Sequence, residues 1–213
     1  SDGVWLVELA PLSDPLLVPQ AIAVALNVRE EPGRPLNQTL ANFLSQKSLL
    51  LIIDNCEHLV EACATLAEAL LRTCPHLKIL VTSREVLRIS GETTFRVPSL
   101  TLPDPHHLPS TDALLRYEAP RLFLARAIAA RPDFQITDPS AVTQICQRLD
   151  GIPLAIELAA ARVKVMTAEQ IAARLDDRFR LLTGGSRTAL PRQQTLRALM
   201  DWSYDLLSQS ERI

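Results

Sequence analysis

The sequence has no C-x-x-C pair, no signal peptide and no long apolar run without charges. The first absence argues against the common zinc and redox motifs, and the other two argue against secretion and against a membrane-spanning helix. Four cysteines are present, at positions 56, 63, 74 and 146. We therefore expect reduced cysteines, buried as small apolar groups, in a protein of the reducing cytoplasm.

Two C-x-H pairs, Cys56 with His58 and Cys74 with His76, leave a zinc site open as the weaker alternative. Zinc sites usually separate paired ligands by two to four residues, which neither pair does. The spacing therefore favours buried thiols over metal ligands.

A strong excess of charge of one sign is also missing. Residues 1–110 carry 8 basic and 12 acidic groups, and residues 111–213 carry 14 and 12. Neither part is basic enough to predict nucleic-acid binding from electrostatics. With 213 residues, 47% of them hydrophobic, the chain can bury the core of one α/β domain and of a smaller domain beside it.

The first hundred residues alternate between two patterns. Short apolar runs at 5–9, 48–54, 77–82 and 94–97 predict strands. The run 48–54 is apolar between its polar ends, Ser48 and Asp54, as in a parallel strand buried on both faces. Amphipathic stretches predict the helices between them. Strands that alternate with helices indicate an α/β fold with a parallel, doubly wound sheet. The predicted helices cover residues 14–26, 36–46 and 57–73.

Prolines at 98, 103, 105 and 109 predict a linker, after which only helical patterns follow. Asp138-Pro139 and the capping box from Thr167 to Gln170 mark two helix starts. A further capping box from Ser208 to Glu211 predicts a helix that the sequence does not continue, so we expect the parent protein to be longer. The predicted helices cover 117–131, 139–149, 152–164, 168–176 and 194–207.

Polar side chains follow two of the predicted strands. In an open parallel sheet, ligands bind at the carboxyl ends of the strands. Asp54-Asn55 ends one strand in a Walker B-like arrangement, where the aspartate can hold Mg²⁺ directly or through water. Thr82-Ser83-Arg84 ends the next, where a hydroxyl can bind water or phosphate and Arg84 can contact a terminal phosphate. An alternative role for Arg84, which the sequence supports equally well, is a surface ion pair with Glu57 or Glu85.

A third candidate is the turn from Gly151 to Leu154, which separates two predicted helices. The glycine can serve simply as a helix C-cap, and Pro153 occupies a first turn, where its missing N–H has no cost. Alternatively, the rigid proline offers an apolar platform for a nucleotide base. The pattern by itself does not choose between the two.

Three segments in this order resemble the STAND family of signal-transducing ATPases. They are Asp54-Asn55-Cys56-Glu57-His58, Thr82-Ser83-Arg84-Glu85, and the stretch 149–160. The similarity is greatest to the bacterial ATPases of LuxR-type and AfsR-like transcriptional regulators, which are related to NB-ARC proteins. Residues 178–185 and 192–197 support it, and 201–207 resembles the opening of that family's winged helix.

The resemblance implies a partial P-loop NTPase-type domain at 1–105, an all-α helical lid at 106–190 and the start of a winged helix at 191–213. It implies ATP or ADP and Mg²⁺ as cofactors, with Asp54 at the metal and Arg84 as the sensor of the terminal phosphate. Thr82 and Ser83 would lie beside the phosphates, and Gly151, Pro153 and Leu154 would pack on adenine. The implied partners are the parent's winged helix, repeat sensor and DNA-binding effector domains.

The sequence departs from the family pattern at two points. The phosphate-binding loop G-x-x-x-x-G-K-[ST], which such proteins place before the strand at Trp5, is absent, so we expect this chain to bind little nucleotide by itself. The position that often carries a catalytic glutamate is Asn55, whose amide cannot act as general base. Glu57 could substitute, although a carboxylate in the first helical turn is the favoured interpretation. Slow hydrolysis or an ADP/ATP switch fits these residues better than fast turnover.

We thus expect the nucleotide-dependent switch of a cytoplasmic bacterial transcriptional regulator. The alternative is a non-catalytic protein-interaction module that has kept the fold without binding nucleotide. Direct DNA binding by residues 194–213 would show as salt-dependent duplex binding, and we expect none.

Overall fold

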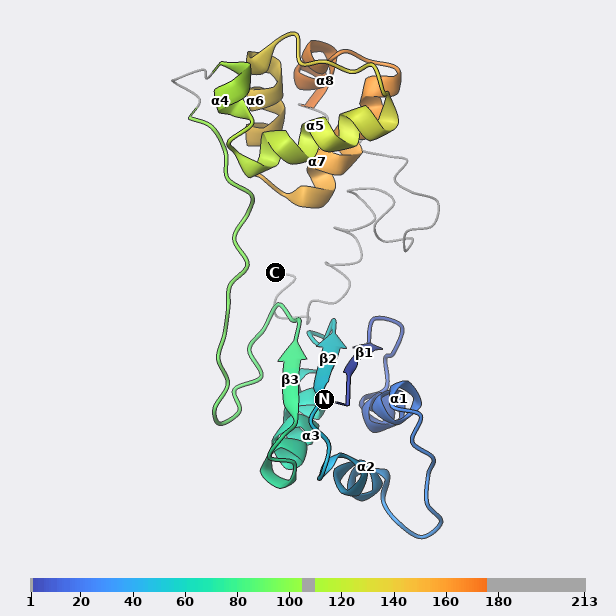
Figure 1. Ribbon diagram of the computed structural model, residues 1–213. Coiled ribbons are helices and arrows are strands. Elements are labelled where there is room, and N and C mark those ends of the chain that lie inside the picture. Colours follow the sequence, from blue (N-terminus) through green and yellow to red (C-terminus); the bar gives the residue numbers. More distant parts are fainter. Residues whose placement is uncertain (1, 105–109, 176–213) are drawn as a thin grey trace, which may run out of the picture. The chain divides into compact units, whose positions relative to one another are not determined.

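The computed structural model describes residues 2–104 and 110–175, and the chain divides into two compact units, Ser1–Phe95 and Arg96–Ile213. We call them the sheet unit and the helical unit and describe each by itself (Figure 1). The predicted helix at 194–207, the winged-helix start and the supporting segments at 178–185 and 192–197 lie outside the described residues. No helix within residues 2–104 and 110–175 is both long and apolar enough to cross a membrane.

The sheet unit contains three parallel strands in the order β1-β2-β3. They are β1 (Val4–Glu8), β2 (Leu50–Asp54) and β3 (Lys78–Val81). These strands confirm the parallel α/β prediction for the described residues. The connections carry η1 (Pro15–Leu17), α1 (Val18–Ala25), α2 (Leu36–Leu44) and α3 (Val60–Thr73).

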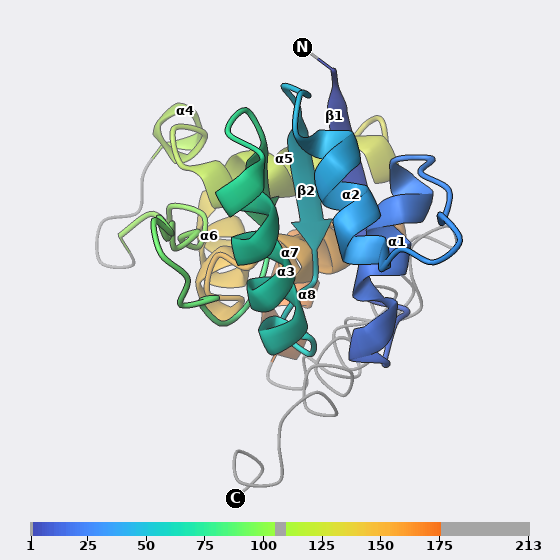
Figure 2. The same cartoon turned by 90° about the horizontal axis from the view of Figure 1, so that it is seen from below.

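Helices cover one face of this sheet. Val7, Leu51 and Ile53 point into a core shared with α1, α2 and α3, and are at most 3% exposed. Val4 and Leu6, which alternate with them, are 65% and 56% exposed. Among the described residues of the sheet unit, no helix covers this second face, so the two-sided winding that we predicted is not found there. We call it the uncovered face. Figure 2 gives a second view of the helices of this unit.

The fourth predicted strand, at 94–97, is wrong. These residues form no strand, and Phe95 and Val97 are 82% and 79% exposed. A strand forms only beside a neighbour that accepts its backbone hydrogen bonds. Within the described residues, β3 has no strand at its outer edge, so this segment has no partner to extend the sheet.

The helical unit confirms the predicted all-α pattern. Asp138 caps its helix by accepting a hydrogen bond from the N–H of Ser140 at 2.9 Å, and the capping box between Thr167 and Gln170 is formed. The predicted helix at 152–164 is split in two, and a short helix was missed. The elements are α4 (Thr111–Leu114), α5 (Glu118–Ala130), α6 (Pro139–Arg148), α7 (Pro153–Ala160), η2 (Ala161–Lys164) and α8 (Ala168–Arg174).

Part of the proline-rich stretch is fixed to the helical unit. The N–H of Leu100 donates to the carbonyl of Gly151 at 3.1 Å. Thr101 and Glu118 cap each other's backbone: the N–H of Thr101 donates to Glu118 Oε2 at 3.0 Å, and the N–H of Glu118 donates to Thr101 Oγ1 at 2.9 Å. The side chain of Gln147 donates to the carbonyl of Pro103 at 3.0 Å. Residues 100–103 are therefore a strap bound along the helices and not a free linker.

The turn after α6 is a Schellman motif. The N–H of Gly151 donates to the carbonyl of Cys146 at 3.2 Å, and the N–H of Asp150 donates to the carbonyl of Gln147 at 2.9 Å. Asp150 holds the left-handed position at φ 53°, directly before Gly151 at φ 66°. A Cβ on Gly151 would lie 2.4 Å from the carbonyl oxygen of Leu100. Glycine is required here by both its φ and the closeness of the strap.

We predict that Gly151→Ala destabilises the protein more than Gly91→Ala. Gly91 has φ 79°, and a Cβ at this position would meet no atom within 4 Å, so alanine there adds backbone strain alone, of about 1–2 kcal/mol. At Gly151 the clash with the strap adds about 1–3 kcal/mol. Denaturant unfolding of both variants measures the difference. If both variants lost the same free energy of unfolding, the strap would have moved away from the new Cβ at position 151 without cost.

Candidate functional site

The carboxyl ends of the strands gather polar side chains on the uncovered face. The register pairs Glu8 with Asp54 and places Thr82 next in the row, directly after Val81, which pairs with Ile53. Neighbours in register project to the same face of a sheet, with strands about 4.8 Å apart. The N–H of Leu9 donates to the carbonyl of Asp54 at 3.0 Å, which continues the pairing beyond β1. Glu8 was missed by the sequence analysis, although it ends its strand just as Asp54 does.

The hydroxyl of Thr82 connects the segment that follows β3 to Asp54 and Asn55 at the end of β2. It donates a short hydrogen bond to Oδ1 of Asp54, and it accepts one from the backbone N–H of Asn55 at 3.0 Å. A hydroxyl has one proton, which is committed to the carboxylate here. The predicted hydrogen bond from Thr82 to water or phosphate would therefore compete with Asp54. In this structure the threonine orients the aspartate.

Arg84 is paired with Glu57 across the same edge. Nε of Arg84 lies 3.4 Å from Oε1 of Glu57, and the two side chains are 41% and 9% exposed, respectively. This is the ion-pair alternative that the sequence left open. Glu57 lies before α3, which begins at Val60, so its expected place in the first helical turn is wrong. Its carboxylate is occupied by the guanidinium, which disfavours a role as general base.

Asn55 and Ser83 have local partners. Asn55 is only 9% exposed, and its side-chain nitrogen lies 3.4 Å from Nδ1 of His58. Ser83 accepts a hydrogen bond from the N–H of Glu85 at 3.1 Å, which shapes the turn after β3. His58 was noticed in the sequence only as half of a C-x-H pair, so its contact with Asn55 was not foreseen.

The remaining predicted residues belong to the helical unit. Pro153 is the first residue of α7, and Leu154 is half-buried against the helical core. Gly151 is the strap-bound residue of the Schellman turn. The C-cap interpretation of this turn is thus observed, with Asp150 in the position expected for the glycine.

The zinc alternative finds no support in the geometry. Nε2 of His58 lies 2.7 Å from the carbonyl oxygen of Leu12, and the thiol of Cys56 lies 3.5 Å from the carbonyl oxygen of Ile53. Among residues 2–104 and 110–175, no group of three or more His, Cys, Asp or Glu side chains is placed to hold a metal ion. All four cysteines are free and buried, as predicted.

Burial also suppresses the reactivity of two of these thiols, Cys56 and Cys146, through their pKa values. It raises the pKa of Cys146 to about 12. A hydrogen bond with Cys63, together with burial, raises the pKa of Cys56, whereas that hydrogen bond lowers the pKa of Cys63, which is 1% exposed. A thiol with a raised pKa carries little thiolate at neutral pH, and thiolate is the reactive form.

We predict that a bulky disulfide reagent at pH 8 labels no cysteine of the native protein and all four after denaturation. The reason is burial of every thiol together with the raised pKa of Cys56 and Cys146. Labelling kinetics followed by absorbance test this. Rapid labelling of one thiol before unfolding would contradict the burial of the four side chains.

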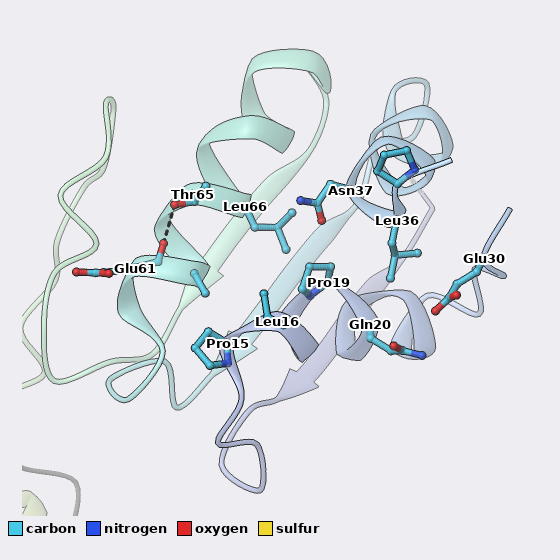
Figure 3. Close-up of a pocket in the computed structure, with 12 residues that line it drawn as sticks. Pro15, Leu16, Pro19, Gln20, Glu30, Leu36, Asn37, Glu61, Thr65 and Leu66 are labelled. Atoms are coloured by element: carbon cyan, nitrogen blue, oxygen red, sulfur yellow. Dashed lines mark hydrogen bonds between the residues drawn. The ribbon is translucent and has the colours of Figure 1, made fainter. Parts of the chain in front are cut away.

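A groove of about 660 Å³ lies elsewhere in the sheet unit, between η1, α1, α2 and the start of α3 (Figure 3). Leu16 and Pro19 face Leu36 and Leu66 across it, with Glu61 near one end. None of the residues predicted to bind nucleotide or metal lines this groove. It is therefore separate from the polar row at the carboxyl edge.

Comparison with known proteins identifies relatives along the whole chain. A Mycobacterium tuberculosis protein named "Putative HTH-type transcriptional regulator Rv0890c" is 47% identical over 214 residues, which cover 100% of this chain and 23% of that protein. The Mycobacterium bovis protein of the same kind, Mb0914c, has the same identity and coverage. A second M. tuberculosis protein, "Uncharacterized protein Rv0894", is 43% identical over 99% of this chain and 51% of its own length.

No family model matches the chain, and no solved structure matches it. The chain spans about a quarter to a half of the curated relatives that it matches. Along its whole length it is thus similar to a segment of proteins that carry the name of HTH-type transcriptional regulators.

Proposed function

We propose that this chain is part of the nucleotide-binding switch of a bacterial transcriptional regulator of the STAND class. The observation that carries the proposal is the linked group at the carboxyl edge of the sheet, where Thr82 joins Asp54 to the turn at Asn55 and Glu57 holds Arg84. The names of the relatives support the regulatory role. Such a regulator would act in the cytoplasm.

The residues present fit a Mg²⁺–nucleotide. Magnesium prefers oxygen ligands and commonly uses one or two carboxylates together with phosphate and water. Asp54 would supply such a carboxylate, oriented through Oδ1 by Thr82. When bound, the metal would neutralise phosphate charge, and Arg84 would add a second positive group on the neighbouring strand end. Glu8, in register with Asp54, is a second carboxylate on the same face.

The shape of the sheet supports the P-loop type of fold. The connections β1-to-β2 and β2-to-β3 run in one direction along the sheet and place α1, α2 and α3 on one face. A preceding strand paired with β3 would connect to β1 in the opposite direction. Because such crossovers are right-handed, its helix would lie on the other face. Away from the polar row at its carboxyl edge, that uncovered face carries apolar side chains, of which Val4, Leu6 and Leu80 are more than half exposed.

By the resemblance, the phosphate-loop strand and helix would precede β1 in the chain, and we propose that this strand pairs with β3. A helix there would bury those apolar side chains at about 25 cal/mol per Å² of area removed from water. The free edge of β3 would gain a partner for its backbone groups, which an exposed edge otherwise leaves open to other chains. This segment would supply most of the phosphate contacts that the present residues lack.

The chemistry fits a slow switch better than a fast enzyme. Asn55 cannot accept a proton from water, and Glu57 is occupied by Arg84. The helical unit, with Gly151, Pro153 and Leu154, would act as the lid over the base. Bound nucleotide would then favour one arrangement of sheet, lid and winged helix over another, with the signal passed on to the sensor and DNA-binding domains.

We predict that the full-length protein binds ADP and ATP in a Mg²⁺-dependent manner, measured by calorimetry. Asp54→Asn should raise the Mg²⁺ concentration needed for half-maximal binding by about 10-fold or more, because it removes the carboxylate charge. Arg84→Ala should weaken the binding of ATP more than the binding of ADP, because the guanidinium is assigned to the terminal phosphate. The matched controls are Glu68→Gln and Arg72→Ala, which alter a surface ion pair on α3 in the same unit. They should change neither the Mg²⁺ dependence of binding nor the relative affinities for ATP and ADP.

Absence of binding to either nucleotide in the intact wild-type protein would reject this function. It would favour the second candidate, a protein-interaction module that has kept the fold. Salt-dependent binding of duplex DNA by residues 194–213 would support the third candidate.

A further inference from the structure

One histidine connects two loops that meet beside the site. Nε2 of His58 lies 2.7 Å from the carbonyl oxygen of Leu12 and 3.1 Å from that of Leu9, in the loop that follows β1. On the other side of the ring, Nδ1 lies 3.4 Å from the side-chain nitrogen of Asn55, in the turn that follows β2. His58 therefore joins residues that are 46 and 49 positions away in sequence to the turn at Asp54.

The surroundings fix the roles of the two ring nitrogens. Carbonyl oxygens only accept hydrogen bonds, so Nε2 must carry the proton that points to Leu12. In the neutral ring, Nδ1 is then an acceptor, which matches the N–H₂ group of Asn55 as a donor. The imidazole is thus a two-sided connector, and an alkyl side chain could replace neither contact.

The backbone of Asn55 shows what this connector holds in place. Asn55 has φ 67°, in the left-handed region that asparagine adopts more readily than most non-glycine residues. In this conformation its N–H reaches the hydroxyl of Thr82 at 3.0 Å, and that hydroxyl donates to Asp54. Asn55 is only 9% exposed and its side chain contacts His58, so the residue keeps the turn that directs this N–H toward Thr82.

We propose that His58 is a positioning residue for the carboxylate of Asp54. It acts through Asn55 and Thr82: the ring holds the side chain of Asn55, the backbone of Asn55 holds the hydroxyl of Thr82, and that hydroxyl turns Asp54 toward its ligand. The assignment of a ligand to Asp54 rests on the proposed function. The chain of contacts itself does not, and it can be tested separately.

The experiment compares His58→Gln, His58→Ala and His76→Ala in the full-length protein. The amide nitrogen of glutamine stands as far from the backbone as Nε2 of histidine, so His58→Gln can still donate to Leu12 but leaves Asn55 without its acceptor. His76 is an exposed histidine of the same unit and controls for the loss of an imidazole. Two readouts are used: the Mg²⁺ dependence of ADP binding, and the amide hydrogen exchange of Asn55.

We expect His58→Gln to keep the wild-type thermal midpoint within a few degrees. The Mg²⁺ concentration for half-maximal ADP binding should nevertheless rise by about 10-fold, as is usual when a residue behind a metal ligand is lost. Exchange of the Asn55 amide should accelerate by at least about 10-fold, whereas amides inside β2 stay unchanged. His58→Ala should show both effects with a lower midpoint, and His76→Ala should show neither.

The two ideas fail in distinguishable ways. Absence of ADP binding in the wild type rejects the proposed function, and the exchange of Asn55 then still tests the contact chain. Wild-type Mg²⁺ dependence in His58→Gln, or unchanged exchange of Asn55 in His58→Ala, overturns the positioning role. A fall in thermal midpoint with both readouts unchanged would show that His58 serves folding alone.

Discussion

The hydroxyl of Thr82 is the contact on which the polar edge of the sheet depends. Its proton goes to Asp54, and it accepts the N–H of Asn55 from the left-handed turn beside it. Thr82 also joins the two strand ends through its backbone, because its carbonyl oxygen accepts a hydrogen bond from the N–H of Cys56 at 3.0 Å. A half-buried carboxylate fixed in this way has little freedom left to lose, so the binding of the proposed Mg²⁺ would cost less entropy than at a mobile side chain.

The strands and most helices could be predicted because their signals are local. The apolar run that ends at Asp54 and the amphipathic stretch of α3 each require only their own residues to be recognised. The polar edge could be predicted from one topological rule, that the carboxyl ends of parallel strands lie at the same edge of a sheet. This rule brings Asp54 and Thr82 to one edge without any knowledge of their side-chain contacts.

What the sequence did not reveal depends on contacts between distant residues. Glu8 joins the row only through the register of β1 on β2, and His58 gains its role from carbonyl groups more than forty residues away. The strand predicted at 94–97 fails for the same reason, since strand propensity is expressed only beside a neighbour. The uncovered face of the sheet could not be predicted either, because the apolar residues of the run 48–54 are equally compatible with burial on both faces.

The strap on the helical unit leaves only a short stretch of chain between the last bonded residues of the sheet unit and the first bonded residue of the helical unit. The carboxylate of Glu92 closes the last turn of the sheet unit by accepting from the N–H of Arg88 at 2.7 Å, and Leu100 is already bonded to Gly151. Only residues 93–99 lie between these anchors, and fully stretched they reach about 25–30 Å.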